Sequence, residues 1–139
     1  TMNVATPAHF AAPADPLAGL FCLSERVAIT VPSTVDVFRP ASPEAVEWVR
    51  RRVASALAEW FGGYTETPGH GGYVSHGGKL IREAVTVVAA FCSPDALAER
   101  LADVVALAAE VAERMGQESV ALEVNGRLYF VTAQVAVPA

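Results

Sequence analysis

The sequence predicts an α+β domain of the ferredoxin-like, split βαβ kind, with two helices on one face of an antiparallel sheet. Segments with strand and helix periodicity follow one another in the order β-α-β-β-α-β. Both helical segments begin with Ser-Pro and an acidic residue, which is a strong helix start. Asn125-Gly126 between residues 119–124 and 127–132 predicts a terminal hairpin that adds one strand. These hairpin signals make a sheet with a parallel core the less favoured alternative.

Length and composition indicate one domain that associates with itself. The chain has 139 residues, a usual size for a single domain. It is 53% hydrophobic and 18% charged, against roughly 25% charged in typical globular domains. Apolar surface should therefore remain after one core is filled, and we expect a homo-oligomer. The net charge of −5 disfavours nucleic acid as a partner, because binding phosphates needs clustered Lys and Arg.

Other classes of protein are disfavoured by particular residues. The run Arg50-Arg51-Arg52 lies in a helical pattern, which indicates a solvated helix edge rather than a phosphate site. Cys22 and Cys92 are too few for a disulfide framework or a zinc site, and we expect no cofactor. No signal-peptide pattern and no membrane-spanning stretch is present, so a cytoplasmic location is expected.

The chain divides into an arm, a domain and a tail. Residues 1–23 are rich in Ala and Pro and predict an N-terminal arm, residues 24–132 the α+β domain, and residues 133–139 a C-terminal tail. Within the domain, residues 26–31 alternate between apolar and other side chains, as the first strand should. Residues 32–41 are expected to form a long connection.

A first helix is predicted directly after this connection. Ser42 is suited to cap it, Pro43 to its first position, and Glu44 to the positive end of the helix dipole. Gly62-Gly63 should end it, because glycine tolerates the left-handed conformation. The expected buried stripe consists of Val46, Val49, Val53, Leu57 and Trp60.

The second half of the chain repeats the pattern after a glycine-rich segment. Residues 64–78 predict a strand, an irregular stretch and a turn. Residues 80–92 predict a long central strand, because both of its faces are apolar or small. Ser93-Pro94-Asp95 then begins a second helix, which Gly116 should end. The expected stripe of this helix consists of Leu97, Leu101, Val104, Leu107 or Ala108, Val111 and Met115.

Three stretches resemble a known family: Gly71-Gly72-Tyr73-Val74, Gly77-Gly78-Lys79-Leu80-Ile81-Arg82-Glu83, and Met115-Gly116-Gln117-Glu118-Ser119-Val120. They resemble an uncharacterised family of small bacterial domains of unknown function. In that family a Gly-x-aromatic turn precedes an Arg-Glu pair, and a Gly-Gln-Glu-Ser-Val junction follows the last helix. The resemblance covers residues 24–124 and implies a ferredoxin-like fold. It implies no activity.

Glu83 is the most informative candidate site residue. Strict alternation along residues 80–92 places it on the core-facing side, with the other odd-numbered residues. A carboxylate there is costly unless it is paired or hydrogen-bonded. Glu83 is therefore either a functional acid or ligand-binding carboxylate, or a structural glutamate that reaches solvent or pairs with an arginine. The candidate partners are Arg82, Arg39 and Arg127.

Histidines of the glycine-rich segment form a second candidate group. His70 and His76 bracket Tyr73, and with Glu83 they would provide two histidines and a carboxylate for a metal. The spacing matches no established metal motif, so we predict that no metal is bound.

Ser33 and Thr34, at the end of the first strand, form a third candidate group. They could bind a ligand or supply a nucleophile, but no Gly-x-Ser-x-Gly elbow is present and turn chemistry accounts for them better. Gln117-Glu118 is expected to satisfy backbone groups at the helix end and the neighbouring strand. No set of residues predicts a catalytic centre.

Three functions therefore stay open. The preferred one is a non-enzymatic binding or regulatory module that acts as a homo-oligomer and binds a small molecule or a protein partner. The alternative is a small enzyme with a cleft near Glu83 and the glycine-rich loop, which uses Glu83 and a histidine for proton transfer. The third is a protein–protein inhibitor or accessory factor. Self-association is expected through the sheet face that the helices leave uncovered.

Overall fold

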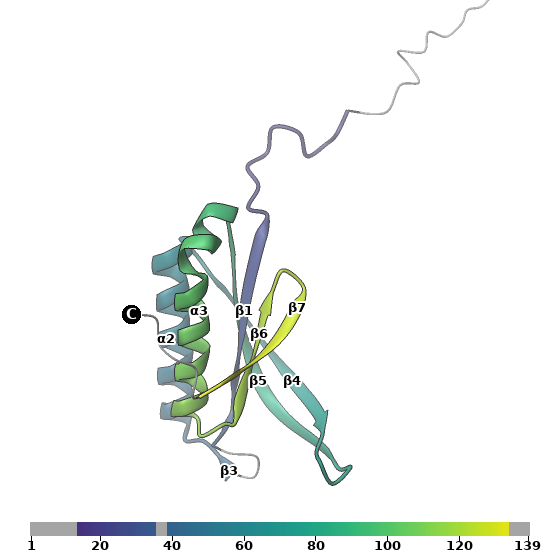
Figure 1. Ribbon diagram of the computed structural model, residues 1–139, viewed down its shortest axis with the longest axis vertical. Coiled ribbons are helices and arrows are strands. Elements are labelled where there is room, and N and C mark those ends of the chain that lie inside the picture. Colours follow the sequence, from purple (N-terminus) through teal and green to yellow (C-terminus); the bar gives the residue numbers. More distant parts are fainter. Residues whose placement is uncertain (1–13, 36–38, 134–139) are drawn as a thin grey trace, which may run out of the picture.

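Two helices pack on one face of a five-stranded antiparallel sheet in the computed structural model, which describes residues 14–35 and 39–133 (Figure 1). The strands lie in the order β4-β5-β1-β6-β7. Their bounds are Glu25–Pro32 for β1, Thr65–Val74 for β4, Leu80–Cys92 for β5, Ser119–Val124 for β6 and Arg127–Thr132 for β7. Without the added hairpin strand β7, this is the split βαβ arrangement, so the predicted ferredoxin-like class is confirmed.

The two helices begin where the sequence predicts. Helix α2 spans Pro43–Phe61 and α3 spans Pro94–Arg114. The hydroxyls of Ser42 and Ser93 each accept a hydrogen bond from the backbone N–H three residues on, at 3.1 Å in both cases. Gly62 ends α2 in the left-handed conformation with φ 89°. Neither helix is long and apolar enough to cross a membrane, and the described ranges contain no other α-helix.

The connection after β1 contains a short ribbon that the sequence does not reveal. Strand β2, Thr34–Val35, pairs antiparallel with β3, Arg39–Pro40. Each strand has two residues, which is too short for a periodic pattern to be detected. The ribbon matters for the site because it fixes Thr34 beside the end of β1.

The pairing of β5 with β1 corrects the predicted orientation of β5. Ile29 of β1 is fully buried in the core and lies opposite Val88 of β5, which is also fully buried. Directly opposite residues point to the same face, so the even-numbered residues of β5 face the helices. The odd-numbered residues, including Glu83, lie on the other face, and the predicted core-facing position of Glu83 is wrong. Because both faces of β5 are apolar or small, the sequence pattern does not determine whether its odd-numbered or its even-numbered residues face the helices.

One member of the predicted stripe of α3 also lies outside the core. Leu101 is 39% exposed, whereas Leu97 is 7% exposed and Val104 is fully buried. Leu97 and Val104 are seven residues apart and so lie on nearly one line of the helix, while Leu101 lies at the margin of that stripe.

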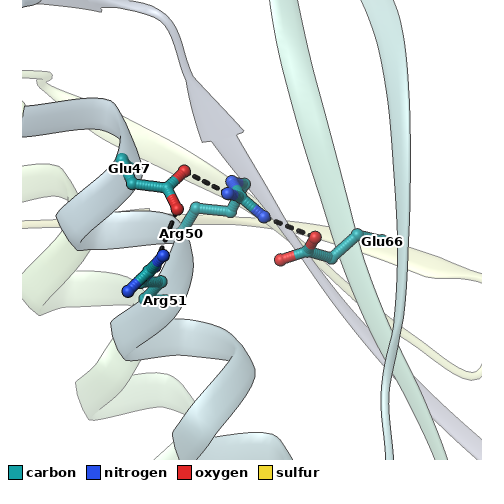
Figure 2. Close-up of polar contacts among 4 residues, drawn as sticks. All are labelled: Glu47, Arg50, Arg51 and Glu66. Carbon is teal, nitrogen blue, oxygen red and sulfur yellow. Dashed lines mark hydrogen bonds and ion pairs between the residues drawn. The ribbon is translucent and has the colours of Figure 1, made fainter. Parts of the chain in front are cut away.

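Ion pairs tie α2 to the edge strand β4 (Figure 2). Arg50 bonds Glu66 of β4 at 2.5 Å and also bonds Glu47 of its own helix. Arg51 bonds Glu47 at 2.7 Å. Arg52 completes the set by bonding a glutamate of α3. Because each arginine of the run has a carboxylate partner, these residues form a charged helix edge and not a phosphate site.

Replacing Arg50 by Ala is expected to loosen β4. The substitution removes the bond between α2 and Glu66, while the cost to the free energy of unfolding should stay near 1 kcal/mol, since partly exposed ion pairs are weak. Hydrogen exchange should therefore become faster at β4 amides while exchange of the β1 amides is unchanged. Arg51→Ala is the matched control, because Arg51 is 77% exposed and bonds only within its helix. Equal effects of the two substitutions on β4 would contradict this account.

Candidate functional site

The sheet surface turned away from α2 and α3, called the open face below, is covered by no helix or strand of the described residues (Figure 1). The strand registers place Phe91, Leu128 and Phe130 on it. These side chains are 55%, 59% and 69% exposed. Self-association through this face, expected from composition, stays a prediction.

A row of three hydrogen-bonded side chains crosses the open face where β1 ends. The Thr34 hydroxyl donates to Oε2 of Glu83 at 2.8 Å. The Gln117 side-chain amide donates to the Thr34 hydroxyl oxygen at 3.1 Å and to the Thr34 carbonyl oxygen at 2.8 Å. The β1–β5 ladder ends with Pro32 opposite Val85. Two residues further along each chain, Thr34 and Glu83 therefore meet on the same face of the sheet.

This row of hydrogen bonds holds the Glu83 carboxylate but supplies no cation to compensate its charge. Glu83 is half-buried, and within the described residues it forms no ion pair. The arginine pairing that the sequence allowed is therefore not formed; a threonine hydroxyl takes its place. Oε1 of Glu83 accepts no hydrogen bond from the described residues.

Strand β4 leaves the space beside Glu83 unobstructed. Gly71 lies directly opposite Glu83, and Gly69 lies opposite Val85. A Cβ at Gly71 would stand 3.7 Å from Cγ1 of Val85, an ordinary contact, so packing within the chain does not require glycine there. The glycines leave a strip of bare backbone beside the carboxylate. Tyr73, two residues beyond Gly71 on the same face and 45% exposed, lies at the end of this strip.

The charge of another carboxylate on the open face, Glu123, is compensated by an arginine. Arg26 of β1 forms an ion pair with Glu123 of β6, and the Gly126 N–H donates to the same carboxylate at 3.2 Å. The Arg26 guanidinium holds the pKa of Glu123 below its usual range. Glu123 thus joins two strands, whereas Glu83 forms no ion pair within the described residues.

Ser33 and His70 lie on the other side of the sheet from Glu83. His70 pairs opposite Ala84, an even-numbered residue of β5, and so points to the helix side. Both residues line a groove of about 430 Å³ that Val46 of α2 also borders. The hypothesised joint action of Glu83 and His70 is therefore not supported, because the sheet separates them.

His76 lies exposed in the turn between β4 and β5. No group of three or more His, Cys, Asp or Glu side chains in residues 14–35 and 39–133 is placed to hold a metal ion. His70, His76 and Glu83 do not form the three-ligand set that their types suggested. That the protein binds no metal and no cofactor stays a prediction.

Gln117 is the site residue that sequence reasoning missed. The sequence assigns it to backbone groups at the helix end and the neighbouring strand, and the structure does show it bonding the Thr34 carbonyl. Its second bond, to the Thr34 hydroxyl, makes it part of the row that holds Glu83. Extending the strand registers beyond the end of β1 would have identified Gln117 as a neighbour of Thr34. This requires that the registers of β5 and β6 are already known.

Comparison with known proteins gives likeness in fold but no family. No family model matches the chain, and no curated protein matches it. A solved structure of a phage S-adenosylmethionine (SAM) lyase in complex with S-methyl-5'-thioadenosine is 21% identical, with a TM-score of 0.57, over 79% of this chain and 90% of that chain. The phage SAM lyase in its apo state is also 21% identical, with a TM-score of 0.57, over 81% of this chain and 92% of that chain. The resemblance to an uncharacterised bacterial family stays a prediction.

These structural neighbours correct the preferred functional hypothesis. They are enzymes, which contradicts the expected non-enzymatic binding or regulatory module. The finding favours the alternative, a small enzyme.

Proposed function

We propose that the protein is a small enzyme that cleaves S-adenosylmethionine and releases S-methyl-5'-thioadenosine, with Glu83 in its active site. The observation that carries the proposal is the half-buried carboxylate of Glu83, which Thr34 orients and no described cation neutralises. The likeness to the SAM lyase supports the choice of substrate and reaction.

The charge change in this reaction suits the surface around Glu83. Releasing S-methyl-5'-thioadenosine breaks the bond between the sulfonium sulfur and the four-carbon amino-acid chain. The electron pair of that bond goes to sulfur, so a cation becomes a neutral thioether. Weakly hydrated surroundings favour a step that removes charge. Ile81 and Val85 flank Glu83 on the open face, and both are half-buried.

The residues divide the binding of this substrate between them. We assign to Glu83 the ammonium group of the amino-acid chain, because a hydrogen bond between two charged groups is strong and directional. We assign to the exposed ring of Tyr73 packing on the adenine or on the sulfonium. With the ammonium held, the carboxylate of the same chain can attack the carbon that leaves sulfur and close a lactone. This route balances without water or an external base.

Binding of the product tests the location of the site. Titration with S-methyl-5'-thioadenosine, followed by amide chemical shifts, should perturb the β4 and β5 residues around Gly71, Tyr73 and Glu83. Shifts confined to the groove of Ser33 and His70 would place the site on the other side of the sheet. An absence of shifts at millimolar ligand would contradict the proposal altogether.

A further inference from the structure

The two free edges of the sheet differ in their protection against further pairing. β4 forms one edge and β7 the other. β4 contains Pro68, the charged Glu66 and several glycines, which are features that discourage the addition of a strand. β7 contains the uninterrupted run Leu-Tyr-Phe-Val between Arg127 and Thr132. β7 is therefore the edge that can accept another strand.

β7 also exposes large apolar side chains on both of its faces. Leu128 and Phe130 lie on the open face, 59% and 69% exposed, and Tyr129 lies on the helix side, 47% exposed. A partner that covered only one face of the sheet would leave the apolar side chains of β7 on the other face exposed to water. A strand added along the edge would shield both sides at once.

The hairpin geometry shows which backbone groups of β7 are free. Val124 and Arg127 flank a two-residue turn, and such flanking residues bond each other. The N–H and C=O groups of Leu128, Phe130 and Thr132 consequently point away from β6. In the described part of the chain no strand pairs with this outer side of β7.

We propose that β7 pairs antiparallel with β7 of a second copy, so that the two sheets join edge to edge. A two-fold axis perpendicular to the sheet keeps every side chain on its own face. A register centred on Phe130 sets it against the partner subunit's Phe130 and matches the outward backbone groups of both strands. Tyr129 then lies opposite the partner subunit's Val131, a favourable aromatic and β-branched pair. The single charge of β7, on Arg127, lies opposite the partner subunit's Ala133, so no like charges meet.

This contact leaves the proposed active site accessible. Glu83 lies on β5, which β1 and β6 separate from β7. A face-to-face contact through the open face, as composition suggested, would instead cover Glu83. The edge contact does not depend on the proposed enzyme activity.

Light scattering on the full chain tests the pairing. At micromolar concentration the expected mass is twice the chain mass of 14.6 kDa. Thr132→Pro removes an N–H that points away from β6, and Phe130→Lys sets two cations opposite each other. Each substitution is expected to reduce the mass to that of one chain. A monomeric unsubstituted protein, or a folded Thr132→Pro protein that stays dimeric, would overturn the proposal.

Phe91→Lys is the matched control for the open face. Phe91 is 55% exposed on β5, away from the β7 edge, so the edge contact predicts an unchanged dimer mass. Dissociation by Phe91→Lys would assign the contact to the open face and overturn the edge pairing. Circular dichroism should confirm that each variant is folded.

Amide hydrogen exchange gives a readout that needs no variant. The outward amides of Leu128, Phe130 and Thr132 should be protected in the dimer, because the partner strand bonds them. Free exchange at all three positions would contradict the proposal even if the protein proved dimeric.

Discussion

Replacing Glu83 by Gln is expected to lower the rate of S-adenosylmethionine cleavage by about 100-fold or more, by analogy with the loss of one preorganised polar group from other active sites. The amide keeps an oxygen to accept the Thr34 hydroxyl bond, but it cannot provide the negative charge for the ammonium of the substrate. The free energy of unfolding should change by little more than about 1 kcal/mol, because Glu83 takes part in no ion pair with the described residues.

A second glutamate separates this effect from a general change in charge. Glu59 is exposed on α2, away from the open face, and Glu59→Gln should leave the rate unchanged. If Glu83→Gln cleaves substrate as fast as Glu59→Gln does, Glu83 is not part of the active site. If Glu83→Gln unfolds the domain, Glu83 is a structural acid and its assigned role is wrong.

Replacing Leu57 by Ala is expected to cost about 2–5 kcal/mol of unfolding free energy. Leu57 is fully buried between α2 and the sheet, so its removal loses apolar burial and leaves a cavity that the close-packed neighbours fill only in part. The urea midpoint should fall while the slope of the transition stays constant.

Leu101→Ala removes the same atoms from α3 and serves as the matched control. Because Leu101 is 39% exposed, its loss should cost less than about 1 kcal/mol. The sequence pattern alone treats both leucines as core residues, so this pair of variants distinguishes the structure from the pattern. Equal costs would show that the packing of α3 against the sheet is described wrongly.

The elements could be predicted from the sequence because their signals are local. Ser42 and Ser93 bond the backbone three residues ahead, and Gly62 adopts its positive φ within the same turn. Asn125 and Gly126 likewise have positive φ of 51° and 82° in the hairpin. Each of these signals acts within a few residues, so no knowledge of the distant chain is needed.

The orientation of β5 could not be predicted, because it depends on long-range pairing. Odd-numbered and even-numbered side chains of β5 are about equally apolar, so only the pairing of Val88 with Ile29 decides which set enters the core. The same pairing places Glu83 on the open face and not in the core. The chemistry of Glu83 indicates a candidate site residue, but the sequence pattern predicts the wrong face of the sheet for it.

The members of the site could be predicted only in part. Thr34, Tyr73 and Glu83 were candidates from their chemistry, and the structure places all three on the open face. Ser33, next to Thr34 in sequence, points into the helix-side groove instead, because neighbouring residues of a strand alternate between faces. Gln117 lies 83 positions from Thr34, so no local pattern could connect the two.

Turnover of S-adenosylmethionine by the purified protein tests the proposed enzyme activity itself. The substrate is incubated with enzyme, with Glu83→Gln enzyme and with buffer alone, and the products are separated and identified by mass. We expect S-methyl-5'-thioadenosine in excess over the enzyme for the unsubstituted protein, and formation at least about 100-fold slower for Glu83→Gln. Substrate that decays at the buffer rate in all three samples would show that the protein does not cleave S-adenosylmethionine.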